Sequence, residues 1–134
     1  MEKYQLTFPQ LSLWSVEQFY KGTSINVITG FIKINETVNF HLFNDAIEIL
    51  IKNTDIFGMH LSYENGELTQ VLTTPKNKGI RLINISCKEE LENLQNTIAK
   101  TPFNIFEDDL FDFTIFKLPD NTGGVIGRFH HIIC

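Results

Sequence analysis

Cysteine is scarce in this chain: its 134 residues include only Cys87 and Cys134. The two residues do not form a CxxC pair, and neither belongs to a closely spaced cluster with histidine of the kind that zinc sites use. We therefore expect no metal site. Free thiols in a reducing compartment explain two isolated cysteines most simply, so we expect a cytoplasmic protein.

Long apolar runs are absent as well. No segment approaches the roughly 20 apolar residues that a membrane-spanning helix needs. The first residues lack the basic stretch and following apolar run of a signal peptide. We therefore expect neither a membrane contact nor a signal peptide.

Basic residues are few and scattered: there are 11 Lys and Arg against 16 Asp and Glu, which gives a net charge of -5. Proteins that bind nucleic acid usually carry a concentrated basic surface that contacts phosphates. The charge pattern therefore argues against nucleic acid as a partner.

Apolar material is plentiful. Hydrophobic residues make up 43% of the chain, and 12 residues are phenylalanine. This composition is sufficient for a packed core and too apolar for a disordered chain. The length fits one domain of ordinary size, and the many phenylalanines suit a sheet that packs against helices.

Three segments have helical spacing of apolar residues. The first runs from Phe8 to Tyr20, with a proline in its first turn. Asn39 is a candidate N-cap for the second, and Ser86 for the third, which extends through Ala99 and ends before Pro102. The apolar stripe expected to face the core in the second helix consists of Leu42, Ala46, Ile47, Leu50 and Ile51.

The remaining apolar segments favour strands. Asn65-Gly66 separates two of them and predicts a tight hairpin, because both turn positions need positive φ. The expected strands are Ile25–Ile34, Ile56–Tyr63, Leu68–Leu72, Ile80–Ile85, Phe111–Leu118 and Val125–Cys134. Strands and helices alternate irregularly along the chain, which indicates a mixed α/β domain.

His130 and His131 form the one concentrated group of chemically active side chains. Adjacent residues of a strand point to opposite faces, so one imidazole can face a cavity while the other packs. That arrangement suits an acid–base role better than metal chelation. Taken alone, two histidines in a strand are more often packing residues than catalytic ones. Arg128 is expected to share the face of His130, and Gly127 that of His131.

The residues around the histidine pair resemble the start of the HHxxxDG motif of nonribosomal peptide synthetase condensation domains, which belong to the chloramphenicol acetyltransferase-like superfamily. Other blocks are similar to family motifs in the same order, over nearly the whole chain. They are Leu6–Trp14 (LSPAQxRLW), Gly22–Val27 (PGSxxYNI), Leu42–Leu61 (LxxALxxLVxRHExLRTxF) and Pro102–Ile105 (PFDL). The departures are Ser12 in place of arginine, Ile25 in place of tyrosine, and residues 53–61, which lack the histidine and arginines of their motif.

This resemblance implies a fold and a division of the chain. The fold class is α/β (an α+β two-layer sandwich), in which a mixed sheet packs with helices as one lobe of a chloramphenicol acetyltransferase-like fold. Residues 1–134 are then the N-terminal lobe, cut within the HHxxxDG motif, with the second lobe absent.

The resemblance also implies a function in secondary-metabolite biosynthesis. Condensation domains join two carrier-bound acyl or aminoacyl thioesters through a peptide bond. His131 is the implied catalytic residue, as a general base or as a group that positions the amine. His130 is implied to be structural, and we expect Arg128, on the same face of the strand, to be a surface or structural residue. Gly127 either leaves room for a substrate arm in a channel or marks a bulge or twist of the strand.

No cofactor is expected to bind directly, since 4'-phosphopantetheine arrives on the partner carrier domains. The implied partners are peptidyl carrier protein domains and the missing C-terminal lobe. Without that lobe we expect no catalysis, and self-association through the exposed lobe face. The alternatives are an epimerisation domain, a free-standing acyltransferase, or a degenerate domain that only docks carrier proteins.

Overall fold

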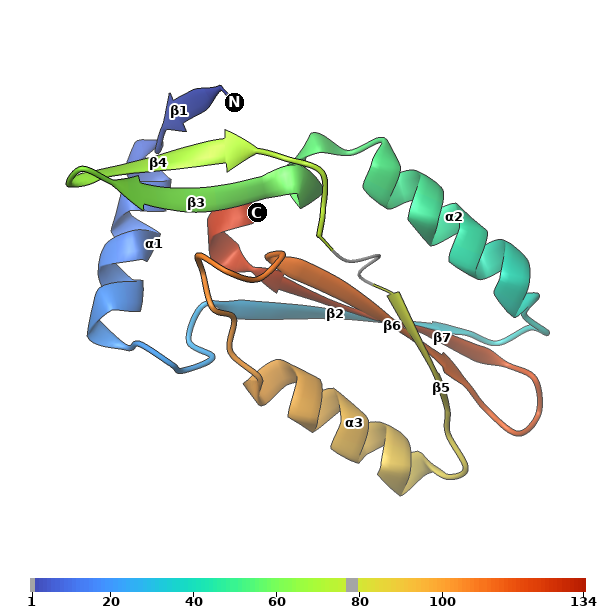
Figure 1. Cartoon of the computed structure of the whole chain (residues 1–134). Helices are drawn as coiled ribbons and strands as arrows, with labels where there is room; N and C mark the ends of the chain where they lie inside the picture. Colours follow the sequence, from blue (N-terminus) through green and yellow to red (C-terminus); the bar gives the residue numbers. More distant parts are fainter. Residues whose placement is uncertain (1, 77–79) are drawn as a thin grey trace.

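The computed structural model describes residues 2–76 and 80–134 (Figure 1). Three α-helices, seven strands and two short 3-10 helices are present in these residues, so the expected mixed α/β fold is confirmed. The helices are α1 (Phe8–Phe19), α2 (Phe40–Lys52) and α3 (Lys88–Lys100); the strands are β1 (Lys3–Gln5), β2 (Val27–Ile34), β3 (Met59–Glu64), β4 (Glu67–Leu72), β5 (Ile80–Asn84), β6 (Phe111–Lys117) and β7 (Gly123–His130); the 3-10 helices are η1 (Asp55–Gly58) and η2 (His131–Ile133).

The main sheet has the order β2-β7-β6-β5, and its β5–β6 pair is parallel while the other pairs are antiparallel. Neighbouring residues of a strand point to opposite faces. Ile115 of β6 accordingly packs with Ile47 and Ile51 of α2, whereas Phe116 packs with Ile98 of α3. One helix therefore covers each face of the sheet, and Figure 1 shows α2 above it and α3 below.

A smaller antiparallel sheet has the order β1-β4-β3. The predicted hairpin between β3 and β4 is confirmed: Asn65 and Gly66 have φ values of 54° and 84°. Met59 and Leu61 of β3 share a core cluster with Phe111 of β6. The small sheet and the main sheet are thus joined by one hydrophobic core.

Local capping explains where two of the helices begin. The Thr7 side chain and the Gln10 side chain form a reciprocal capping box at α1. The Asn39 side chain accepts from the Leu42 amide at 3.2 Å, which confirms the predicted cap of α2.

The predicted cap of α3 is wrong. The N-cap is Cys87, which makes no side-chain capping bond. The Ser86 amide and hydroxyl both donate to the Glu90 carboxylate, at 2.7 Å and 2.6 Å. Ser86 therefore lies one residue before the N-cap, where it donates hydrogen bonds to Glu90 instead of capping the helix.

Of the five residues in the predicted apolar stripe of α2, two are buried and three are exposed. Ile47 and Ile51 are buried, but Leu42 and Leu50 remain 64% and 48% exposed. Apolar residues extend around about half of this helix, and its packing against η1 and β5 selects the side that carries Ile47 and Ile51. The rest of the stripe faces outward.

Two further differences concern short elements. Strand β3 begins at Met59 rather than Ile56, because residues 55–58 form η1. The short strand β1 was not predicted, and it forms by pairing with the distant β4.

No helix in the described residues is both long and apolar enough to cross a bilayer.

Candidate active site

Strand β7 ends at His130, and the predicted strand through Cys134 is therefore wrong at its end. The chain turns into η2 because the His130 ring accepts a hydrogen bond at Nδ1 from the Ile132 amide, at 3.1 Å. The Gln10 side chain donates to the Ile132 carbonyl at 3.2 Å and so attaches the turn to α1. The two histidines consequently lie on either side of a change in backbone direction.

His130 is almost completely buried, with 1% of its surface exposed. Its Nε2 lies 3.2 Å from Oε2 of Glu17 in α1, and the Asn26 amide donates to the same oxygen at 2.7 Å. The Phe103 ring meets the imidazole edge-on, with centroids 6.1 Å apart. Burial lowers the pKa of His130, although the Glu17 carboxylate acts in the opposite direction.

His131 is exposed, in contrast to its neighbour. Its backbone amide donates to the Asn26 carbonyl at 2.8 Å, which continues the β2–β7 pairing by one residue. The main chain at His131 is therefore fixed while the imidazole stays accessible. One ring of the pair is available for chemistry and the other is not.

Arg128 connects three parts of the fold. Its guanidinium donates to the Asp112 carboxylate of β6 at 2.8 Å and to the Thr101 carbonyl after α3 at 2.9 Å. Its charged centre also lies 4.0 Å from the centroid of the Phe103 ring. Arg128 thus fixes the loop that carries Phe103, so that the Phe103 ring packs against His130.

Gly127 is buried in β7, opposite Gly30 of β2. A Cβ atom built at Gly127 would lie 2.7 Å from two atoms of the Phe129 ring. In this structure the missing side chain leaves room for that ring. A role in a substrate channel remains a prediction.

Sequence patterns did not identify Glu17 and Asn26 as members of the site. They lie 113 and 104 positions before His130, so no local pattern links them to it. A weak signal was present in Glu17, an acidic residue beside the apolar stripe of a helix. Within the described residues, no group of three or more His, Cys, Asp or Glu side chains could hold a metal ion.

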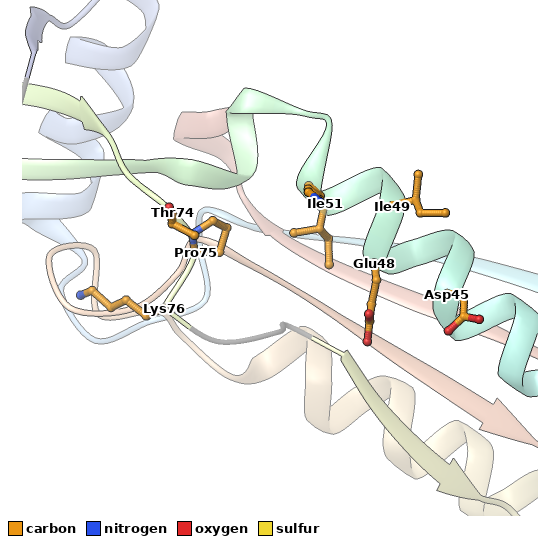
Figure 2. Close-up of a pocket in the computed structure, with 8 residues that line it drawn as sticks. Asp45, Glu48, Ile49, Ile51, Thr74, Pro75 and Lys76 are labelled. Carbon is orange, nitrogen blue, oxygen red and sulfur yellow. The ribbon is translucent and has the colours of Figure 1, made fainter.

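Of two hollows at the surface, one adjoins the candidate site. One hollow, of about 690 Å³, lies between α2 and residues 74–76. Glu48 and Lys76 are among its lining residues, which Figure 2 shows. This hollow includes neither histidine of the pair. The other, of about 460 Å³, lies between α1 and residues 102–106, with Glu17 and Phe103 in its wall. That hollow is the one that adjoins the buried side of the site.

Solved structures share this fold. The starter condensation domain of rhizomide synthetase RzmA superimposes with a TM-score of 0.89 at 18% identity, over 98% of this chain and 33% of that one. The first condensation domain of the calcium-dependent antibiotic synthetase, in complex with substrate analogue 2a, gives a TM-score of 0.88 at 15% identity, over 98% of this chain and 33% of that one. Both likenesses show that the chain has the fold of part of a condensation domain, which confirms the expected mixed α/β fold.

Two curated relatives are much longer synthase subunits. Surfactin synthase subunit 1 of Bacillus subtilis (strain 168) is 28% identical over 145 residues, which cover 97% of this chain and 4% of the relative. A plipastatin synthase of the same organism is 29% identical over 133 residues, covering 97% and 5%. The chain therefore spans a small part of these relatives and about a third of the solved domains. The sequence model of the condensation domain matches residues 1–134, and this chain belongs to the condensation domain family.

Proposed function

We propose that residues 1–134 supply the histidine-bearing lobe of a condensation domain that forms amide bonds in nonribosomal peptide synthesis. The observation that carries this proposal is the exposed His131, whose backbone is fixed beside a buried His130. A reactive imidazole on a rigid support is what an acyl-transfer site requires.

In the proposed reaction, the amine of a downstream aminoacyl group attacks the thioester carbonyl of an upstream acyl group. The new C–N bond forms, the C–S bond breaks, and the upstream carrier thiol leaves. His131 acts in one of two ways. As a general base, it takes the proton from the attacking nitrogen and returns it to the departing sulfur. As a positioning group, it orients the amine and stabilises the charge of the tetrahedral intermediate.

The neighbouring residues have supporting roles in this proposal. His130 and Arg128 are structural, and their contacts with Glu17, Asp112 and Phe103 support this assignment. Gly127 borders the substrate channel. The ring of Phe129 beside it would move for a substrate arm to pass along β7.

The proposed partners are peptidyl carrier protein domains and a second lobe. Each substrate reaches the site on a 4'-phosphopantetheine arm that the carrier holds. A variant of the rhizomide synthetase domain was solved in complex with a coenzyme A ligand, and coenzyme A contains the same arm. Because the chain spans about a third of the solved condensation domains, we propose that it is inactive alone. The cytoplasm remains the expected location.

The test is an amide-formation assay of a two-lobed domain made by joining this chain to the second lobe of a related condensation domain. Carrier proteins loaded with an acyl group and an amino acid serve as substrates, and mass spectrometry detects the product. His131→Ala should reduce turnover at least a hundredfold, in line with the contribution of about 10²–10⁴ from a general acid–base residue.

His41→Ala is the matched control, because His41 is exposed on α2 and its ion-pair partner is Asp45, at 3.0 Å. It should leave turnover unchanged. If the His131→Ala domain forms amide as fast as the control, the catalytic assignment is wrong. If the unmodified two-lobed domain, with both histidines intact, binds loaded carriers but forms no amide, it is a docking domain.

A further inference from the structure

One carboxylate oxygen lies at the centre of the site. Oε2 of Glu17 is within 3.2 Å of His130 Nε2 and accepts from Asn26 Nδ2 at 2.7 Å. Glu17 is itself buried, with 6% of its surface exposed, and it is the one buried residue of α1, whose apolar side chains are at most half-buried. A carboxylate is costly to bury, so its donors are needed to keep it there.

Both donors of Glu17 also hold the backbone around His131. The His130 ring accepts from the Ile132 amide at 3.1 Å, on the C-terminal side of His131. The Asn26 carbonyl accepts from the His131 amide at 2.8 Å. A change at Glu17 would therefore reach His131 by two routes, neither of which involves a direct contact.

The contacts of His130 also define its tautomer. The Ile132 amide can only donate, so Nδ1 must carry a lone pair. A neutral ring then has its proton on Nε2, from which it donates to the Glu17 carboxylate. Glu17 thus selects the tautomer that closes η2.

We propose that Glu17 is a positioning residue, which orders the backbone of His131 through His130 and Asn26 and holds His130 as the Nε2–H tautomer. Its consequence for catalysis rests on the function proposed above, whereas its consequence for structure does not. Glu17 touches neither substrate nor His131 itself.

The test uses ¹⁵N-labelled chain and two readouts that require no activity. Imidazole nitrogen shifts report the tautomer of His130, and amide hydrogen exchange reports the order of the His131 backbone. Wild-type protein at pH 7.5 should show a neutral Nε2–H ring at His130. Glu17→Leu removes the oxygen that accepts from both His130 and Asn26, and it should speed exchange of the His131 amide about tenfold, equivalent to ~1.4 kcal/mol.

Glu17→Gln provides a graded comparison, because an amide oxygen can still accept both bonds but carries no charge. It should keep most of the His131 protection and lower the pKa of His130 further. Glu36→Leu and Glu36→Gln are the matched controls, since Glu36 is exposed in the loop after β2. They should change neither readout.

The inference is overturned if folded Glu17→Leu protein keeps wild-type protection at His131, or if wild-type His130 carries its proton on Nδ1. The second result needs no variant, so an unstable Glu17→Leu chain would still leave a decisive measurement. In the two-lobed domain, Glu17→Leu should lower kcat with little change in KM. If the exchange result holds but His131→Ala retains full turnover, the positioning role stands and the proposed function falls.

Discussion

Gly124 lies in β7 at a point where the backbone of β2 leaves no space for a side chain. A Cβ atom there would overlap the Ile32 carbonyl oxygen and lie 2.7 Å from the Phe116 ring. The ring could move, but the carbonyl belongs to the neighbouring strand. We expect Gly124→Ala to lower the free energy of unfolding by about 1–3 kcal/mol, the usual cost of overpacking.

Urea denaturation of Gly124→Ala and Gly30→Ala would check this prediction. Gly30 lies in β2, and an added Cβ there would have no atom within 4 Å. Its substitution should change stability by no more than about 0.5 kcal/mol. Equal losses for the two variants would show that β2 and β7 do not approach each other closely at Gly124.

A second prediction at the residue scale concerns acid. Burial lowers the pKa of His130 below its ordinary value of 6.5. The unfolded chain therefore binds a proton at this residue at a higher pH than the folded chain does. Stability should be at its full value above pH 6.5 and fall as the pH drops below it. Urea midpoints measured between pH 7.5 and 5.5 would record the fall.

His130→Gln should flatten this pH dependence, although it lowers stability at pH 7.5, while His41→Gln should preserve the wild-type slope. The carboxyls with lowered pKa, Glu64, Glu90 and Asp120, have ordinary values of 4.5, 4.5 and 3.8 and titrate below this window. A wild-type stability that is constant from pH 7.5 to 5.5 would contradict the burial of a neutral His130.

At the residue scale, the sequence predicts the histidine pair of the candidate site but not the residues that support it. Two adjacent histidines are visible in the sequence, and a strand pattern suggests that their environments differ. Glu17 and Asn26 become neighbours of His130 only when α1 and the start of β2 pack beside the end of β7. The ring of Phe129, which fills the space at Gly127, likewise depends on tertiary packing.

At the scale of elements, the two helix caps allow a paired prediction. Asn39→Ala removes the side-chain acceptor of the Leu42 amide at the start of α2. It should lower the free energy of unfolding by about 1 kcal/mol. Cys87→Ser introduces a preferred N-cap residue at α3, where the thiol makes no capping bond. It should raise stability by about 0.5 kcal/mol or more.

Chemical denaturation of both variants and the wild type would measure these changes. Cys134→Ser, a thiol-to-hydroxyl change outside any helix N-terminus, is the control for Cys87→Ser. If Cys87→Ser gives no gain while Asn39→Ala is destabilising, then Ser86 and Glu90 already satisfy the first turn of α3.

Elements with strong local signals were predicted well. The β3–β4 turn needs positive φ at Asn65 and Gly66, and the Asn-Gly pair predicts such a turn. Strand β1 carries no such signal, because three residues become a strand only by pairing with β4. The outward half of α2 was missed for a related reason: apolar spacing identifies a helix but not which side of a wide apolar arc meets the core.

At the scale of the whole molecule, the main sheet has two open edges, β2 and β5. An open edge presents unpaired backbone groups, and native proteins usually blunt it with charge or shortness. Strand β5 has five residues, whereas β2 has eight and a single charge, Lys33. Ile32 on β2 and Leu42 on α2 are 62% and 64% exposed. Apolar surface of this kind is typical of a face that another protein surface covers.

We therefore expect the isolated chain to self-associate through the exposed apolar residues of β2 and α2 when no second lobe is present. Light scattering coupled to size-exclusion chromatography should show a mass that rises with concentration. Ile32→Lys and Leu42→Lys should each weaken association about tenfold, which corresponds to ~1.4 kcal/mol. Leu82→Lys is the matched control, because Leu82 is 57% exposed on the opposite edge strand. Association that only Leu82→Lys weakens would assign the contact to the β5 edge, and a monomer at every concentration would show that both edges are sufficiently protected by their own side chains.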